Sequence, residues 1–417
     1  MKSITRSFSE TARSFSLVIG SMSKDSVLVI NCGSSSLKFA VINPKTEEES
    51  ISGIAERLVG NEASITWKLN GEKQTLNLGA AGHEGAIEAL VGVLRENNLM
   101  ERIEAIGHRV VHGGEKFTES TLINDEVIQG IEDCNHLAPL HNPAHLLGIR
   151  ACMKYFPGLP QSVVFDTAFH QTMPAESYLY AVPYSLYKEH GLRRYGMHGT
   201  SYRYVSKTAA EMLGLDYDNS AILVAHLGNG ASACAVKNGK SVDTTMGLTP
   251  LEGLVMGTRS GDIDPNVFSF LNKQCGYSLD EITDILNKKS GLLGLSEMDN
   301  DCRVIEDAAA QGNERAQLTL DVFCNVLAKK LAGFASELGR IDALVFTGGI
   351  GENSSVIRKN VLERLSIFGF EIDEKANEET FRGKSGVITK PGSTVAMVVA
   401  TNEELMIARD TEALIAG

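Results

Sequence analysis

Arginine and histidine stand beside glycine in three short segments of this sequence. The segments are HRVVHGG at 108–114, RRYGMHGT at 193–200 and TRSGD at 258–262. A planar guanidinium group can bind carboxylate or phosphoryl oxygens through two hydrogen bonds, and glycine lets a ligand approach the backbone closely. A single arginine is usually only a surface residue. Three such segments together indicate a site for an anionic substrate.

Three glycine-bearing turns could hold phosphate. GSSS at 33–36, GNG at 228–230 and GGIG at 348–351 each follow a short apolar run, and Lys38 lies just beyond the first turn. Backbone N–H groups and serine hydroxyls in such turns can hold phosphate oxygens, although each turn alone could be an ordinary hairpin. The P-loop pattern is missing, and Ser354 stands where a dinucleotide motif needs its third glycine. Phosphate must therefore be held in another way.

An acidic residue ends another apolar run. Asp166 follows Val163-Val164-Phe165, and such a position at the end of a strand is where α/β proteins often place catalytic groups. The alternative is that Asp166 caps the segment that follows it. His141-Asn142-Pro143 is typical of a loop that positions a substrate.

The elements that must hold these residues occur twice. Residues 27–31 and 37–42 predict a strand, a tight turn and a strand, and residues 221–225 and 231–236 repeat that pattern. Asn238-Gly239 predicts a type I′ hairpin turn, in which both central residues need positive φ. Further strands are expected at 105–111, 162–166, 241–244, 343–346 and 395–399, and Ile87, Leu90, Val91 and Leu94 mark one face of a helix.

Two copies of one plan predict a duplicated, two-domain α/β fold whose glycine-bearing turns face each other across a cleft. We expect the domains at 23–170 together with 403–417, and at 171–402. Thr401-Asn402-Glu403-Glu404 matches the T-x-x-E capping box and is expected to open the last helix, which returns to the first domain.

Bulk properties exclude several classes of protein. The formal charge of -13 and the pI near 5.3 argue against nucleic-acid binding and suit a soluble cytoplasmic enzyme. No apolar run approaches the roughly 20 residues that cross a bilayer. The seven cysteines show no C-x-x-C spacing, which favours free thiols in a reducing compartment. Residues 1–22 loosely resemble a transit peptide, but an upstream translation start before Met22 or an unstructured leader is the preferred interpretation.

With these segments in order, the chain closely resembles the acetate kinase family, within the superfamily that contains actin, the sugar kinases and the heat-shock chaperone ATPases. The resemblance runs from about residue 26 to the C-terminus. It rests on NCGSSSLKF, GHRVVHGG, PLHNP, VFDTAFHQTMP, RRYGMHGTS, HLGNGAS, MGTRSGDIDP, FTGGIGENS and TNEEL. It implies an actin-like ATPase fold, reversible in-line phosphoryl transfer from Mg-ATP to acetate giving acetyl phosphate and ADP, and a homodimer.

The resemblance also implies site residues. Asp166, His198 and Arg259 are similar to the family's catalytic residues, and Arg109 and His141 to residues on the acceptor side. Asn31 and Glu403 would hold Mg²⁺, or Mn²⁺ in its place. The implied ATP-binding set is Lys38, Ser34, Ser36, His226, Leu227, Gly228, Asn229, Gly230, Asp301, Cys302, Arg303, Gly349, Ile350, Gly351, Glu352 and Asn353.

Two rival functions are weighed against this one. A sugar or polyol kinase would use Asp166 as a base, but a neutral hydroxyl gains little from two guanidinium groups. A chaperone-like or filament-forming ATPase would need a peptide-binding domain or polymer contacts. Acetate is already ionised at neutral pH, so Asp166 has no proton to remove and is expected to orient the magnesium shell or Arg109. The preference among acetate, propionate and butyrate does not follow from the sequence.

Overall fold

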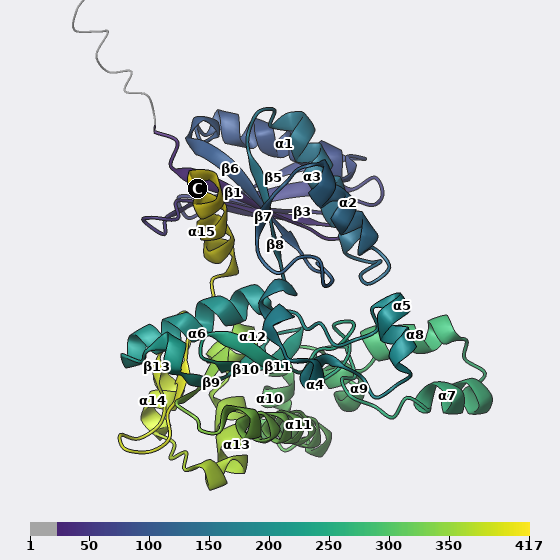
Figure 1. Cartoon of the computed structure of the whole chain (residues 1–417), viewed down its shortest axis with the longest axis vertical. Coiled ribbons are helices and arrows are strands. Elements are labelled where there is room, and N and C mark those ends of the chain that lie inside the picture. The colour runs from purple at the N-terminus through teal and green to yellow at the C-terminus, as the bar shows by residue number, and fades with distance from the viewer. Residues whose placement is uncertain (1–22) are drawn as a thin grey trace, which may run out of the picture. The chain divides into compact units, whose positions relative to one another are not determined.

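A computed structural model of the chain describes residues 23–417. Its contacts divide the chain into two compact units (Figure 1). Unit 1 comprises the chain up to Arg109 together with Ala144–Val163 and Ile407–Gly417, and unit 2 comprises Val110–Pro143 and Val164–Met406. The leader expected at 1–22 lies outside the described residues. The domain limits expected from the sequence stay a prediction.

The first sheet has the strand order β5-β4-β3-β2-β1-β6-β8-β7, and the division between the units passes through the ends of β6 and β8. At its centre β1 pairs antiparallel with β2 and parallel with β6. The strands are β1 (Ser26–Cys32), β2 (Leu37–Ile42), β3 (Glu49–Glu56), β4 (Ala63–Leu69), β5 (Glu72–Gly79), β6 (Ile103–Val110), β7 (Thr121–Leu122) and β8 (Gln161–Phe165).

Helices α1 (Gly82–Glu96) and α3 (Asn142–Tyr155) and the short η1 (Met100–Arg102) follow strands of this sheet. The predicted apolar face of α1 is confirmed, since Ile87, Leu90, Val91 and Leu94 are all buried in one core with β1, β2 and β3. Ala151, Cys152 and Phe156 join the same core from α3 and the residue after it.

The last helix, α15 (Glu403–Ala416), packs against β6 by its final turns (Figure 1). A Cβ atom built on Gly107 would lie only 2.5 Å from Thr411 Oγ1, so the glycine makes this close approach possible. Thr411 Oγ1 also lies 2.6 Å from Ser162 Oγ of β8. Helix α15 therefore completes the packing of the sheet that contains β1.

The second sheet has the order β11-β10-β9-β12-β14-β13. β9 pairs antiparallel with β10 and parallel with β12, as β1 does with β2 and β6. Asn238 and Gly239 both have positive φ, of 53° and 77°, so the predicted hairpin turn is confirmed. The strands are β9 (Ala221–Leu227), β10 (Ala231–Lys237), β11 (Lys240–Thr244), β12 (Ala343–Thr347), β13 (Gly386–Val387) and β14 (Ala396–Val398).

Two apolar cores cover the faces of this sheet. Leu223 and Ala225 pack with the long helix α11, whereas Ile222 and Val224 pack with α6. The helices of unit 2 are α2 (Asp125–Asp133), η2 (Ala168–Thr172), α4 (Ala175–Tyr178), α5 (Tyr184–His190), α6 (Gly199–Leu213), η3 (Tyr217–Asn219), α7 (Val267–Cys275), α8 (Leu279–Lys288), α9 (Gly291–Ser296), α10 (Cys302–Ala310), α11 (Glu314–Leu338), α12 (Gly348–Asn353), α13 (Ser355–Arg364), η4 (Ser366–Phe368) and α14 (Glu374–Glu379).

The duplicated α/β fold expected from the sequence is confirmed, because β3-β2-β1-β6-β8 and β11-β10-β9-β12-β14 follow one plan. The predicted capping box is wrong in detail. Asn402, not Thr401, caps α15, since Asn402 Oδ1 accepts from Leu405 N at 3.1 Å.

All seven cysteines are free. Among residues 23–417, no helix is long and apolar enough to cross a membrane.

Candidate active site

The turn between β9 and β10 is fixed by its backbone and by one asparagine. Gly228 N donates to Gly230 O at 3.1 Å and closes the turn. Asn229 O accepts from Gly257 N at 2.9 Å, and Asn229 Oδ1 accepts from Asn300 Nδ2 at 3.2 Å. The turn is thereby bonded to the residues directly before two of the predicted segments, 258–262 and 301–303.

A histidine and an arginine from other elements converge on this turn. A Cβ atom built on Gly230 would lie 3.6 Å from Arg259 Nη1 and 3.7 Å from His198 Nε2. Arg259 Nη1 donates to Pro250 O at 3.1 Å, and burial lowers the pKa of Arg259 from its ordinary value. Arginine is protonated in proteins, so a cation and an imidazole nitrogen border the bare backbone of the turn, an arrangement suited to phosphoryl oxygens.

His198 is held in an unusual backbone conformation. It precedes α6 with φ 59° and ψ 16°, in the left-handed backbone region that residues other than glycine rarely adopt. Gly199 N donates to Asp166 O at 2.9 Å, and a Cβ atom on Gly199 would lie only 2.5 Å from that oxygen. The structure therefore brings the backbone of the buried Asp166, after β8, to the start of α6 and next to His198.

A second histidine lies against the first. The rings of His198 and His226 stack with centroids 4.2 Å apart and planes inclined by 24°. Each ring turns Nδ1 toward a serine hydroxyl at 2.8 Å, Ser232 for His198 and Ser201 for His226. Ser201 Oγ also lies 2.8 Å from Thr401 Oγ1. Hydrogen bonds at Nδ1 thus orient both imidazoles.

The segment predicted to close over the adenosine begins at the same strand end. Gly348, at φ 78°, opens α12, and a Cβ atom there would lie 2.7 Å from Leu227 O. Glu352 Oε2 accepts from Thr347 Oγ1 and from Thr401 N, both at 3.5 Å. Burial raises the pKa of Glu352 above its ordinary value. The contacts tie α12 to the turn on one side and to the segment before α15 on the other.

The segment at 301–303 presents only part of its predicted set to solvent. Asp301 caps α10 by accepting from Arg303 N at 2.9 Å, and its Oδ2 lies 2.8 Å from Arg303 Nη2. Cys302 is buried in the core, where its Sγ donates to Glu306 Oε1 at 3.5 Å and burial raises the pKa of the thiol. Arg303 is therefore the exposed side chain of this segment, and Asp301 is half-buried.

The predicted substrate loop is tied to the segment after β6. Asn142 is fully buried, accepts from His112 N at 3.2 Å and donates to His112 O at 2.8 Å. Gly113 N donates to Thr167 Oγ1 at 2.9 Å, directly after Asp166. The half-buried His141 stands next to Asn142, so two of the predicted segments of unit 2 are hydrogen-bonded together.

Unit 1 carries the predicted residues of the turn between β1 and β2, whereas Glu403 belongs to unit 2. Asn31 and Lys38 are cross-strand partners, and Gly33 N donates to Ser36 O at 2.8 Å. His83 Nε2 of α1 lies 2.6 Å from Gly33 O. The turn is therefore anchored by α1.

Arg109 stands at the same edge of that sheet. Ile30 pairs with His108 across the parallel strands β1 and β6, so Arg109 comes level with Asn31 one residue further on. Arg109 is half-buried, and Ser34 and Lys38 are exposed.

Comparison with known proteins explains why these segments occur together. A model of the acetokinase family matches residues 26–409. The acetate kinase of Shewanella amazonensis is 57% identical over 397 residues, which cover 94% of this chain and all of that protein. The chain belongs to the acetokinase family.

Solved structures of the same kind share the fold of this acetokinase-family chain. A propionate kinase from Francisella tularensis superposes with a TM-score of 0.89 at 48% identity, and the acetate kinase of Porphyromonas gingivalis with 0.90 at 47%. Each comparison covers 94% of this chain and all of the other. The predicted family resemblance is confirmed.

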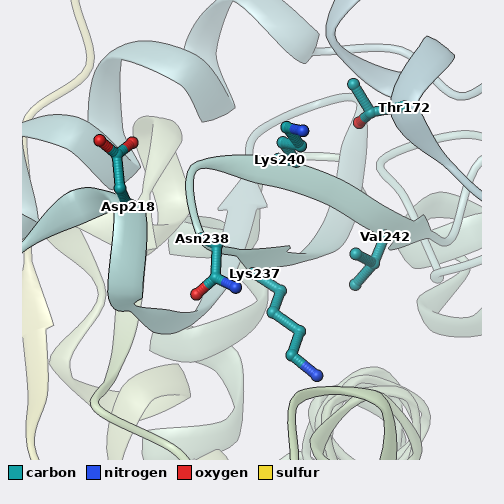
Figure 2. A pocket seen from close by; sticks show the side chains of 6 residues that line it. All are labelled: Thr172, Asp218, Lys237, Asn238, Lys240 and Val242. Atoms are coloured by element: carbon teal, nitrogen blue, oxygen red, sulfur yellow. The ribbon is translucent and has the colours of Figure 1, made fainter.

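One open cavity is lined by residues of the hairpin between β10 and β11 and by Thr172, which lies in the VFDTAFHQTMP segment (Figure 2). It has a volume of about 440 Å³ and surrounds the hairpin between β10 and β11. Lys237 at its margin donates to Glu337 O at 3.5 Å. None of the predicted site residues lines it; the lining residues are Thr172, Asp218, Lys237, Asn238, Lys240 and Val242.

Sequence reasoning missed the hydroxyl residues behind the two histidines. Ser201 and Ser232 lie inside the segments RRYGMHGTS and HLGNGAS, directly beside predicted residues, but nothing in their spacing marks them as histidine partners. Tyr202 and Thr401 were missed for the same reason. Their partners come from other elements of unit 2, and only the fold brings them together.

Proposed function

We propose that this chain transfers the γ-phosphoryl group of ATP reversibly to acetate, giving acetyl phosphate and ADP. The observation that carries the proposal is the convergence of His198 Nε2 and the Arg259 guanidinium on the backbone of Gly230. Membership of the acetokinase family supports it, as do relatives of matching length that are named acetate kinase.

The physical problem of this reaction is the approach of two anions. A carboxylate oxygen must attack the γ-phosphorus while the bond from that phosphorus to ADP breaks in line. We assign His198 and Arg259 to the oxygens of the transferring group, because preorganised donors and cations stabilise charge there with little reorganisation. We assign Arg109, supported by His141, to the acetate carboxylate.

Asp166 completes the proposed catalytic set without acting as a base. Acetate carries no proton at neutral pH, so no proton needs removal during attack. Asp166 is almost fully buried, and its carbonyl holds the start of α6 through Gly199 N. We propose that its carboxylate orients Arg109 or the water shell of the metal.

The nucleotide is assigned to both hairpin turns. Lys38, Ser34 and Ser36 would donate to phosphate oxygens, as would the backbone of residues 226–230. The base and ribose would meet Asp301 and Arg303, with the buried Cys302 shaping the segment, and residues 349–353 would close over the adenosine. Support comes from the hydrogen bond between Asn229 and Asn300, which joins the β9–β10 turn to the residue before the proposed base-binding segment.

Mg²⁺, with Mn²⁺ as a substitute, is the expected cofactor. The residues fit this ion, because Asn31 offers an amide oxygen and Glu403 a carboxylate, both half-buried, and magnesium prefers oxygen ligands and keeps several waters. When bound, the ion supplies positive charge against the phosphates. We further propose a homodimer in the cytoplasm, with domains at 23–170 plus 403–417 and at 171–402.

The direct test is formation of acyl phosphate from ATP and Mg²⁺, trapped with hydroxylamine. Acetate should give hydroxamate, whereas glycerol and glucose should give none, and a reaction without acceptor should release little ADP because water is excluded from the transfer. ADP release that depends on a sugar, without hydroxamate, would replace the proposal by a sugar kinase. Filaments formed on adding ATP would favour the ATPase rival.

Propionate is the second candidate acceptor. A solved relative at 48% identity over its whole length is named a propionate kinase. One additional buried methylene is worth about 0.8 kcal/mol, or about fourfold in preference, so a small change in the pocket can reverse the order of the two acids. Including propionate and butyrate in the same hydroxamate assay ranks the acids.

A further inference from the structure

Two buried hydroxyl groups stand in line behind the ring of His198. His198 Nδ1 lies 2.8 Å from Ser232 Oγ of β10, and Ser232 Oγ is hydrogen-bonded in turn to the Tyr202 hydroxyl of α6. Ser232 and Tyr202 are both fully buried. We call Tyr202, Ser232 and His198 the hydroxyl relay.

The protons of the relay can be assigned by counting donors and acceptors. Burial raises the pKa of Tyr202 well above its ordinary value, so its hydroxyl keeps a proton to donate. Within the described chain, Ser232 Oγ is the hydrogen-bond partner of that hydroxyl. A buried donor without an acceptor is costly, so Tyr202 donates to Ser232. The serine proton then points to His198 Nδ1, its other partner.

The direction of the relay determines the tautomer of His198. A neutral imidazole has one donor and one acceptor nitrogen, so when Nδ1 accepts from Ser232, the proton resides on Nε2. Nε2 is the nitrogen that borders Gly230 beside Arg259 Nη1. An N–H donor is thus directed at the position proposed for the phosphoryl group.

We propose that Tyr202 and Ser232 are positioning residues, which fix His198 as the Nε2–H tautomer and so present a neutral N–H donor to the transferring phosphoryl group. The second half of this statement rests on the proposed function, whereas the tautomer does not. Two features keep the ring in place: the left-handed backbone of His198 and the stacking on His226.

The stacked neighbour has a different hydroxyl chain behind its Nδ1. His226 Nδ1 meets Ser201 Oγ, whose second partner is the hydroxyl of Thr401. That threonine hydroxyl is only half-buried, so nothing comparable forces it to donate to Ser201. The chain of hydroxyls that starts at Tyr202 leads to His198.

The tautomer can be read by nitrogen NMR of the full-length protein labelled with [¹⁵N]histidine, without substrate. Protonated and accepting imidazole nitrogens resonate far apart, and His198→Asn identifies the His198 signals by their loss. We expect Nε2 protonated and Nδ1 unprotonated in the unmodified chain. Tyr202→Phe and Ser232→Ala should each give intermediate shifts, because the proton is no longer confined to Nε2.

Tyr217→Phe is the matched control. Its hydroxyl lies 2.7 Å from Ser206 Oγ of the same helix α6, so the variant loses a comparable tyrosine–serine hydrogen bond outside the relay. It should leave the His198 signals and kcat unchanged. Tyr202→Phe should lower kcat about tenfold, the size of one lost hydrogen bond, with little change in KM for either substrate.

The outcomes separate the inference from the function it serves. A His198 that is protonated on Nδ1 in the unmodified chain, or shifts that both relay variants leave unchanged, would overturn the relay even in an active acetate kinase. Altered shifts with unchanged kcat would refute positioning for the reaction. Altered shifts in a chain that phosphorylates no carboxylate would uphold the tautomer assignment and refute only the proposed function.

Discussion

The β1–β2 and β9–β10 hairpins occupy equivalent positions in the two sheets, yet different groups surround their turns. The β1–β2 turn carries its own donors, with exposed Ser34 and with Lys38 opposite Asn31. The β9–β10 turn offers only backbone at Gly228 and Gly230, and its charged and imidazole groups come from α6 and from the loop at 258–262.

This difference shows how a duplicated scaffold can divide one task. A flexible lysine beside the turn can keep its contact with a phosphate group that changes position. A turn of bare backbone, bordered by side chains that other elements hold, fixes positions more rigidly, as electrostatic stabilisation of a transition state requires. We therefore expect substitutions around the β9–β10 turn to act on kcat and those in the β1–β2 turn to act on binding.

Removing the arginine beside the β9–β10 turn should have the largest effect. Arg259→Ala is expected to lower kcat by about 10³-fold, the lower range of arginine-finger effects. Hydroxamate formation from acetate measures it. Arg340→Ala is the control, because Arg340 is a half-exposed arginine paired with Asp342 at 3.0 Å, away from the site segments. A loss seen only in KM would show uniform substrate binding instead.

Adding one methyl group to the turn tests its rigidity. Gly230 does not adopt positive φ, so alanine is allowed there, but its Cβ would enter the space that Arg259 and His198 face. We expect Gly230→Ala to lower kcat by about 10²-fold through displacement of the transferring group. Gly386→Ala, in β13 with nothing within 4 Å of the new Cβ, should retain full activity. Equal activity of both variants would refute the assignment of this turn.

Lys38 tests the other hairpin. Lys38→Met should lower kcat/KM for ATP about 30-fold, the size of one lost charge-assisted hydrogen bond, mainly through KM. Initial rates at varied ATP measure the change. Lys68→Met, an exposed lysine of β4, supplies the control. A pure kcat effect would mean that the two turns share one role.

A difference between the sheet centres should appear as pH dependence of stability. Between β6 and β8, His108 Nε2 lies 2.6 Å from Gln161 Oε1, whereas the corresponding strands β12 and β14 pair Val345 with Met397. Burial lowers the pKa of His108 from 6.5 to about 4. The unfolded chain therefore binds this proton first, and stability falls as pH drops from 6.5 towards 4.

Replacing both partners should remove this dependence in unit 1. The double variant His108→Leu, Gln161→Leu should reduce the slope of unfolding free energy by up to about 1.4 kcal/mol per pH unit between pH 6.5 and 4, with little change at pH 7.5. Hydrogen exchange of the β1 and β6 amides measures it. An exposed histidine changed the same way, His190→Leu, should leave the slope as it was. An unaltered slope in the double variant would locate the acid sensitivity elsewhere.

Local patterns predicted the fold well where one segment suffices. The apolar runs before Gly33 and Gly228 are β1 and β9, and the face of Ile87 and Leu90 lies in the core of unit 1, because periodicity and glycine turns are properties of a few consecutive residues. The equivalence of the two sheets followed from repeating one such pattern.

Contacts between distant segments could not be predicted in the same way. The capping-box pattern predicted Thr401 as the cap of α15, but Asn402 caps the helix and Thr401 pairs with Ser201. Likewise Tyr202 reaches Ser232 only because α6 packs on the second sheet. Hydrogen bonds of this kind depend on tertiary packing, which no spacing within either segment records.

The packing of α15 on β6 affects how the protein folds during its synthesis on the ribosome. Thr411 contacts Gly107 and Ser162, but about 240 residues of unit 2 are made between Val163 and Ile407. At roughly 5–20 residues per second, the sheet of unit 1 waits for roughly ten to fifty seconds before its last helix exists. Nascent unit 1 thus exposes the surface of β6 that α15 later covers, until that helix has been synthesised.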